Sequence, residues 1–154
     1  MKIEEKFMLA ALKEADKAEA IDEVPIGCVI VKDGKIIARG FNHRETDNDP
    51  TGHAEIIALR KASKKLKDWQ LVDCELYVTL EPCIMCGGAI IQSRIKRVYF
   101  GAYDFKGGAF GSSIDILKAE NINHRPVIIP GLLQKECSEK ITNYFKKKRG
   151  QNHE

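Results

Sequence analysis

The sequence contains no long apolar run, since none approaches the roughly 20 consecutive apolar residues that a membrane-spanning helix requires. Residues 1–6 mix lysine and glutamate and lack the apolar region of a secretory leader, so we expect no such leader here. Repeats, linkers and low-complexity segments are also missing. We therefore expect one domain over residues 1–154, with no membrane among its partners.

Cysteine and tryptophan are scarce. The five cysteines are an odd number, and if two of them bind a metal, the other three need no disulfides. This usage fits the reducing environment of the cytoplasm, where we expect the protein to be located. Cys28, Cys74 and Cys137 each lie in an apolar stretch, and we expect these cysteines and the single tryptophan, Trp69, to be core residues.

The composition is otherwise that of an ordinary globular protein. A chain of 154 residues, 44% hydrophobic and 31% charged, can bury a substantial core. The net charge of +3 at pH 7 is a mild bias that by itself says little about a nucleic-acid partner. Four cations, Lys146-Lys147-Lys148-Arg149, gather near the end of the chain, although such a run is usually a solvated tail.

Hydrophobic periodicity divides the chain into helices and strands. Phe7, Ala11, Ala15 and Ala18 recur at helical spacing, and Asp33-Gly34 is a strong signal for a type I′ hairpin turn. The order of the elements favours an α/β fold, a three-layer α/β/α sandwich around a mixed sheet. Helices are predicted over residues 4–20, 53–64, 83–93, 113–119 and 133–148, and strands over residues 26–32, 35–41, 75–80, 97–102 and 126–129.

One short stretch, Pro82-Cys83-Ile84-Met85-Cys86, carries the strongest chemical signal. Proline favours the first position of a helix, so we expect Cys83 and Cys86 in the first helical turn, on one face. The positive end of the helix dipole favours thiolates there, and thiolates bind zinc. His53, just before an apolar periodic run, is the obvious third ligand. Three protein ligands leave the fourth position of a zinc ion to water, as in catalytic sites.

Glu55 lies two residues after His53 and is well placed to move the protons of such a water. Zinc lowers the pKa of bound water to about 7, which makes hydroxide available at neutral pH. The sequence therefore predicts a zinc-activated water and a glutamate proton shuttle.

Two other interpretations of the cysteine pair compete with this one. A redox pair would leave His53 and Glu55 unexplained. A structural zinc site would need a fourth ligand, although the apolar surroundings of the remaining cysteines favour the core. The candidates for that ligand are Cys28, Cys74 and Cys137.

His53-Ala54-Glu55, followed by Pro82-Cys83 and Cys86, resembles the signature of zinc-dependent nucleoside and nucleobase deaminases. Three further segments make the sequence similar, over nearly all its length, to the bacterial tRNA-specific adenosine deaminases of the cytidine-deaminase-like superfamily. The chain departs from that family at Gly52, where alanine is usual, and at Phe110, where smaller residues are common. The three segments are Leu76-Tyr77-Val78-Thr79-Leu80-Glu81, Gly101-Ala102-Tyr103-Asp104-Phe105-Lys106-Gly107-Gly108 and Asn123-His124-Arg125.

The resemblance implies a cytidine-deaminase-like fold with a five-stranded sheet, a homodimer, and hydrolytic conversion of adenosine to inosine at the wobble position of a tRNA anticodon. It implies one Zn²⁺ per subunit on His53, Cys83 and Cys86, and Glu55 as the residue that carries protons to N1 and to the leaving amine. The implied substrate contacts are Val24, Pro25 and Ile26 around the base, Asn42 on its edge, and Ala54, Asp104, Lys106, Asn123, Phe145 and Arg149.

The same metal chemistry also serves small-molecule deaminases. These enzymes act on guanine, cytosine or a free nucleoside in a closed pocket, and the zinc signature alone does not exclude them. An RNA deaminase must instead take its base out of the stack, so its substrate would be a splayed loop nucleotide. A catalytically silent RNA-binding module is a third class, against which the intact His53, Glu55, Cys83 and Cys86 argue.

Overall fold

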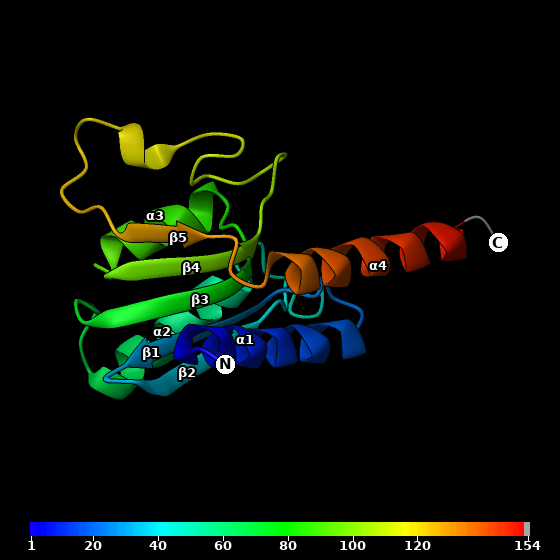
Figure 1. Ribbon diagram of the computed structural model, residues 1–154, viewed down its shortest axis with the longest axis horizontal. Coiled ribbons are helices and arrows are strands. Elements are labelled where there is room, and N and C mark those ends of the chain that lie inside the picture. The colour runs from blue at the N-terminus through cyan, green and yellow to red at the C-terminus, as the bar shows by residue number, and fades with distance from the viewer. Residues whose placement is uncertain (153–154) are drawn as a thin grey trace.

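A five-stranded mixed sheet forms the middle layer of the protein, whose computed structural model describes residues 1–152 (Figure 1). Strand β1 pairs antiparallel with both β2 and β3, whereas β3, β4 and β5 run parallel. The predicted mixed sheet is therefore confirmed, and the carboxyl ends of three parallel strands lie at one edge. In spatial order the strands are β2 (Lys35–Phe41), β1 (Gly27–Lys32), β3 (Cys74–Leu80), β4 (Arg97–Ala102) and β5 (Val127–Pro130).

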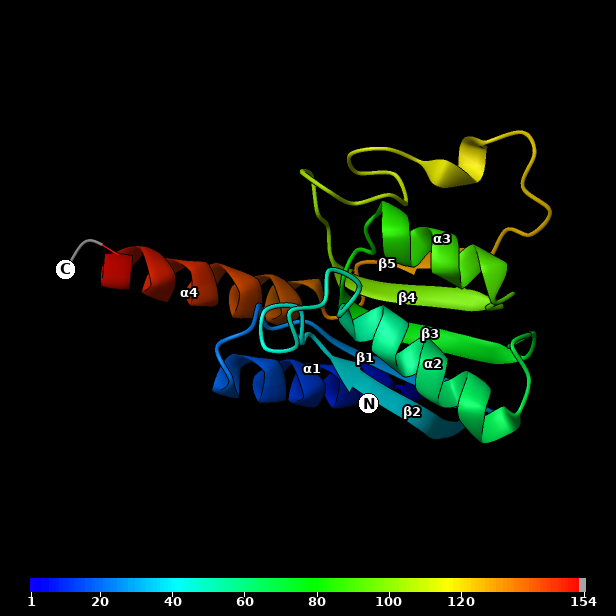
Figure 2. The same ribbon diagram turned by 180° about the vertical axis from the view of Figure 1, so that it is seen from behind.

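Helices cover both faces of the sheet and complete the three predicted layers. Alternate residues of β1 divide between two cores: Cys28 and Ile30 pack in one, and Val29 and Val31 in the other. Figures 1 and 2 show the two faces from opposite sides. One face carries α1 (Ile3–Ala20) and α4 (Gln134–Asn152), and the other carries α2 (Ala54–Leu66) and α3 (Ile84–Gln92).

The backbone of the β1–β2 hairpin confirms one prediction and explains one contact with α2. The turn between β1 and β2 has the predicted type I′ character, because Asp33 (φ 51°) and Gly34 (φ 74°) both adopt the left-handed conformation. Further along β2, Gly40 allows α2 to approach the sheet closely, since a Cβ there would lie 2.5 Å from the carbonyl oxygen of Ala54. The amino end of α2 therefore has a fixed position above the sheet.

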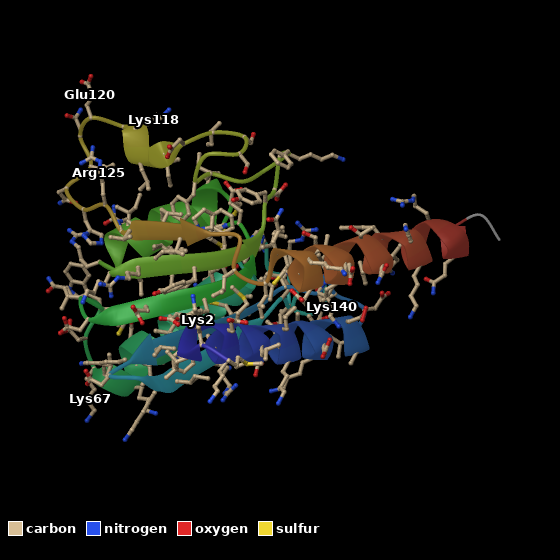
Figure 3. The ribbon with its side chains drawn as sticks, in the orientation of Figure 1. Lys2, Lys67, Lys118, Glu120, Arg125 and Lys140 are labelled. Carbon is tan, nitrogen blue, oxygen red and sulfur yellow. The ribbon has the colours of Figure 1, made fainter. Side chains whose placement is uncertain are left out.

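Helix α4 projects beyond the sheet and is anchored along α1 (Figure 1). Lys140 of α4, which is labelled in Figure 3, pairs with Asp16 of α1. One turn further, the hydroxyl of Tyr144 donates to the main-chain carbonyl of Asp22 at 3.2 Å, and another turn on, Nζ of Lys148 lies 2.5 Å from the Asp22 carboxylate. These contacts accompany a helix that is longer than the predicted 133–148.

The prediction that three cysteines and the single tryptophan are core residues is partly right. Cys28, Cys74 and Cys137 are all buried, as expected. The prediction for Trp69 is wrong, because this residue follows the end of α2 and is 59% exposed. Its ring is covered only in part, by the guanidinium of Arg94 at 5.7 Å from the ring centroid.

The helix predicted over residues 113–119 is reduced to a short 3-10 helix, η1 (Ile116–Lys118). The side chain of Asp115 accepts a hydrogen bond from the backbone N–H of Leu117, and this local contact competes with an α-helical turn. Among the helices of residues 1–152, none combines the length and apolar character needed to cross a membrane.

Candidate active site

Three metal-binding side chains meet at the amino ends of α2 and α3. His53 is the N-cap residue of α2, Cys83 is the N-cap residue of α3, and Cys86 lies in the first turn of α3. Their donor atoms all lie within 4.8 Å of one another. Pro82 precedes the N-cap and does not occupy the predicted first helical position, because Cys83 itself takes the extended backbone (ψ 178°) that a cap requires.

The spacing of the donor atoms fits a zinc ion. Nδ1 of His53 lies 3.6 Å from Sγ of Cys83 and 3.5 Å from Sγ of Cys86. Tetrahedral bonds of about 2.3 Å to sulfur and about 2.1 Å to nitrogen would separate such atoms by about 3.6 Å. Two sulfurs and one imidazole also form a donor set that zinc favours. With three protein ligands, the fourth coordination position belongs to water or substrate.

The charge state of Cys83 suits metal binding. A hydrogen bond from the thiol of Cys86, joined by one from His53, holds the pKa of Cys83 far below its ordinary value of 9.0. The hydrogen bond between His53 and Cys83 in turn raises the pKa of His53 above 6.5. A thiolate at the positive end of a helix is the form that binds a metal.

Glu55 lies in the first turn of α2 and is 4% exposed. Burial raises the pKa of its carboxyl from 4.5 to about 7, because a charged carboxylate is poorly solvated there. A carboxyl group with a pKa near neutrality can both accept and release a proton at physiological pH. This property suits a residue that moves protons beside the metal cluster.

Asn42 joins the loop after β2 to the start of α2. Its side-chain oxygen accepts the backbone N–H of Ala54 at 2.9 Å, which satisfies one of the free donors at the amino end of the helix. Asn42 is 7% exposed. With its oxygen in use, its NH₂ group is the part that remains to donate to a ligand.

A pocket of about 630 Å³ includes His53 and is also lined by residues of the loop after β2 and of α4. It contains five of the ten predicted substrate residues: Val24, Ile26, Asn42, Phe145 and Arg149. Positively charged side chains line it from two segments: Arg44 from the loop after β2, and Lys148 and Arg149 from α4. The full lining is Glu23, Val24, Ile26, Asn42, Arg44, Glu45, His53, Tyr144, Phe145, Lys148 and Arg149.

The remaining predicted substrate residues lie outside this lining. Pro25 and Ala54 are buried next to lining residues, and Asp104 and Lys106 lie on the segment that follows the carboxyl end of β4. Asn123 lies in the segment before β5, between Glu120 and Arg125 in the sequence. Figure 3 shows Glu120 and Arg125 far from α4. Within one chain, Asn123 therefore lies away from the metal cluster.

Two buried glutamates were not predicted as functional, yet each holds a segment beside the site. Glu23 is 3% exposed and accepts the backbone N–H groups of Glu45 at 3.2 Å and Thr46 at 2.6 Å. Glu81 is 2% exposed and accepts N–H groups from three residues of the segment after β4: Asp104, Phe110 and Ser112. The sequence offers little signal for either tether: Glu81 lies between the apolar Leu80 and Pro82, but Glu23 follows another acidic residue, Asp22.

The structure explains both departures from the family pattern. A Cβ at Gly52 would lie 3.1 Å from the backbone of Arg44 and from the carbonyl oxygen of Asp49, so glycine fits a tightly closed loop. Phe110 is 8% exposed and packs beside Gly87 of α3, where a Cβ would lie 3.4 Å from the phenyl ring. Neither departure removes a metal-binding side chain.

Comparison with known proteins adds independent information. Residues 1–102 match the cytidine and deoxycytidylate deaminase zinc-binding region. The chain is 49% identical over 147 residues to the tRNA-specific adenosine deaminase of Haemophilus influenzae, covering 95% of this chain and 85% of that protein. It is 45% identical over 146 residues to the Bacillus subtilis enzyme of the same name, covering 95% and 91%.

Two solved structures have the same fold. One comes from work on A-to-I editing by tRNA:A34 deaminases at the wobble position of transfer RNA; it gives a TM-score of 0.85 at 46% identity and covers 88% of this chain and 98% of that one. The other is guanine deaminase from Bacillus subtilis, with a TM-score of 0.63 at 36% identity, covering 95% and 93%.

Proposed function

The chain belongs to the tRNA-specific adenosine deaminases, within the family that shares the cytidine and deoxycytidylate deaminase zinc-binding region, and from this we propose that it converts adenosine to inosine at the wobble position of a tRNA anticodon. One observation carries the proposal: His53 of the metal-ligand cluster lines a pocket whose other walls supply cations and an aromatic ring. That combination suits a base joined to phosphates better than it suits a free base.

His53, Cys83 and Cys86 would hold the zinc ion. When bound, zinc supplies the Lewis acidity that makes water nucleophilic at neutral pH. The reaction adds water at C6 of adenine and releases ammonia, which leaves a carbonyl group at C6. The protons in this exchange need a nearby group to carry them, and Glu55 is a buried carboxyl beside the ligands, whereas the buried Glu81 already accepts three backbone N–H groups.

Glu55 acts as the proton shuttle. It accepts a proton from the attacking water, passes it to N1 of the adenine, and later delivers a proton to the departing amino group. Its pKa of about 7 supports this role, since both protonation states are accessible at neutral pH. Asn42 meets the base edge as a donor, because its oxygen is already bonded to Ala54.

The part of the pocket away from His53, which we call its outer end, receives the nucleotides that flank the adenine. Arg44, Lys148 and Arg149 place positive charge there, and Phe145 offers an aromatic ring that is 41% exposed. Phosphates pair with such cations, and unpaired bases stack on aromatic rings. Asp104 and Lys106 extend this surface along the segment after β4, whereas Asn123 could join it only from a second chain.

The structure also has features that support a homodimer. Trp69, 59% exposed, borders an apolar groove of about 550 Å³ between α2 and α3 that includes Ile56, Leu59 and Ala89. A second copy seated there would cover this apolar surface. Light scattering of the wild type and of Trp69→Glu tests this: a dimer that dissociates in the variant supports the interface, and a monomeric wild type excludes it. We also propose that the protein is located in the cytoplasm, because a tRNA substrate is consistent with that location.

A small-molecule deaminase is the second candidate, because the guanine deaminase of Bacillus subtilis shares the fold at 36% identity. The deciding experiment incubates the protein with an anticodon stem-loop carrying a wobble adenine and, separately, with adenosine, guanine and cytosine at equal concentration. We expect inosine in the stem-loop at a far higher rate than any free substrate reacts, because contacts outside the base offset the cost of flipping it. Rapid deamination of free guanine with an unchanged stem-loop would decide for the second candidate.

A further inference from the structure

Phe105 is the most exposed aromatic side chain of residues 1–152, with 76% of its surface accessible. Tyr103, 37% exposed, stacks beside it with ring centroids 6.2 Å apart and planes 13° from parallel. Lys106, next in the chain, is exposed as well. Burying a phenyl ring is strongly favourable, so a ring left this accessible calls for an explanation.

The turn that carries Phe105 is held in place by hydrogen bonds. The carboxylate of Asp104 accepts the backbone N–H groups of Lys106 and Gly107, both at 3.1 Å. The backbone N–H of Gly108 donates to the carbonyl oxygen of Asp104 at 2.8 Å. The ring is therefore presented from a fixed turn, and ordering it on binding costs little conformational entropy.

Two contacts tie this turn to the residues just before the zinc ligand Cys83. Glu81 accepts the backbone N–H of Asp104 at 3.2 Å, and the carbonyl oxygen of Pro82 accepts that of Ala109 at 2.9 Å. A Cβ at Gly108 would lie 2.4 Å from Cδ of Glu81, so glycine permits this close approach. The exposed ring is thus anchored, through its backbone, to the metal end of the pocket.

We propose that Phe105 is a stacking platform for an unpaired base of the RNA substrate, beside the adenine that reacts. The proposal rests on the proposed function and adds a binding contact to it. Lys106 lies next to the ring and can pair with the phosphate of the stacked nucleotide, as in other single-strand binding surfaces. Of the two residues on either side of Phe105 only Tyr103 is aromatic, and the others are Asp104, Lys106 and Gly107, which suits a nucleotide better than a broad apolar protein surface.

The test compares Phe105→Ala with Phe105→Tyr, which keeps the aromatic face. We expect Phe105→Ala to raise the KM for the stem-loop about tenfold, the order of magnitude for removal of one base–aromatic stack. The kcat should change much less, zinc content should stay the same, and Phe105→Tyr should restore the wild-type KM. An unchanged KM in Phe105→Ala would overturn the proposal, and so would a loss of the oligomer in that variant, since the ring would then lie between subunits.

A second readout measures stacking without turnover. 2-Aminopurine, whose fluorescence is quenched by stacking, is placed at each loop position beside the wobble adenine in turn. We expect quenching by the wild type at one position, relieved by Phe105→Ala and kept by Phe105→Tyr. Equal quenching by all three proteins at every position would contradict the proposal. If the wild type deaminates no stem-loop, the proposed function fails by itself, and this binding experiment still decides the role of the ring.

Discussion

The two ends of the pocket are held by different kinds of contact. At the inner end, His53 and Cys83 are cap residues of two helices packed on one face of the sheet, so the backbone of the fold places the ligands. At the outer end, the loop after β2 depends on the carboxylate of Glu23. The first turn of α4 packs in the core through Cys137, but the part of α4 that reaches the pocket contacts α1 and its end through side chains, in ion pairs with Asp16 and Asp22. The backbone of the fold therefore positions the metal ligands, whereas side-chain contacts position much of the surface that binds the substrate.

This difference predicts that the two ends can be damaged separately. A change at the inner end should abolish metal binding or proton transfer while the outer surface still binds RNA. A change at the outer end should weaken RNA binding while zinc remains.

Replacing a zinc ligand should have the largest effect. Cys83→Ala should lose bound zinc and reduce turnover by more than the roughly 10²- to 10⁴-fold that removal of a proton shuttle typically costs, since both the nucleophile and its position depend on the metal. Metal analysis and a stem-loop assay measure this. Cys74→Ala is the matched control, because Cys74 is buried at the opposite end of β3 and should keep its zinc. A fully active Cys83→Ala protein would remove the basis of the assignment.

Glu55→Gln should separate metal binding from proton transfer. The amide keeps the shape of the side chain but cannot shuttle a proton, so turnover should fall by roughly 10²- to 10⁴-fold. Zinc content and affinity for the stem-loop should stay close to wild type. If the zinc is lost, Glu55 is a ligand and not a shuttle.

The sequence allowed the inner end to be predicted because its signals are local. The spacing of Cys83 and Cys86, and of His53 and Glu55, combines with residue types that have few other uses together. The outer end could be predicted only through resemblance to a family. Glu23 acts on backbone N–H groups 22 and 23 residues further along the chain, and no short pattern marks such a contact. Trp69 was predicted wrongly for the same reason, since burial of a loop side chain depends on what packs over it.

Glu23→Gln should loosen the outer end. One carboxylate oxygen now accepts the N–H and hydroxyl of Thr46, and an NH₂ group facing such donors would leave them unpaired. We expect a loss of about 1–3 kcal/mol in the free energy of unfolding and a higher KM for the stem-loop. Denaturant titration and steady-state kinetics measure the two effects. A variant with reduced zinc content would show that the ends are not separable.

The pH dependence of that stability loss tests the role of the Glu23 charge. Burial raises the pKa of Glu23, but hydrogen bonds from Thr46 and Glu45 outweigh it, so the net pKa lies below the ordinary 4.5. A lowered folded-state pKa means that the ionised group stabilises the protein above pH 4.5 and that this stabilisation is lost as the pH falls through the folded-state value. The difference between wild type and Glu23→Gln should therefore be largest above pH 4.5 and shrink below it. A difference that grows at low pH would contradict this sign.

Removing residues 146–154 should have the smallest effect. The deletion takes away Lys146, Lys147, Lys148 and Arg149, and for each of these cations that pairs with a phosphate, the salt dependence of RNA binding should fall by a slope of about 0.7. It also removes the ion pair of Lys148 with Asp22, but that pair is largely exposed and contributes little to stability. Removing residues 150–154 alone, of which His153 and Glu154 lie outside the described residues, is the control and should leave the slope unchanged. An identical slope in the longer deletion would make the four cations a solvated tail.

We infer that the side chains at the outer end of the pocket select which adenine reaches the metal. The most direct test measures inosine formation in two stem-loops of identical composition, one with adenine at the wobble position and one with that adenine moved by a single position. We expect rapid conversion of the first and loss of most activity on the second, because the flanking nucleotides no longer meet the side chains that bind them. Equal conversion of both stem-loops would contradict it.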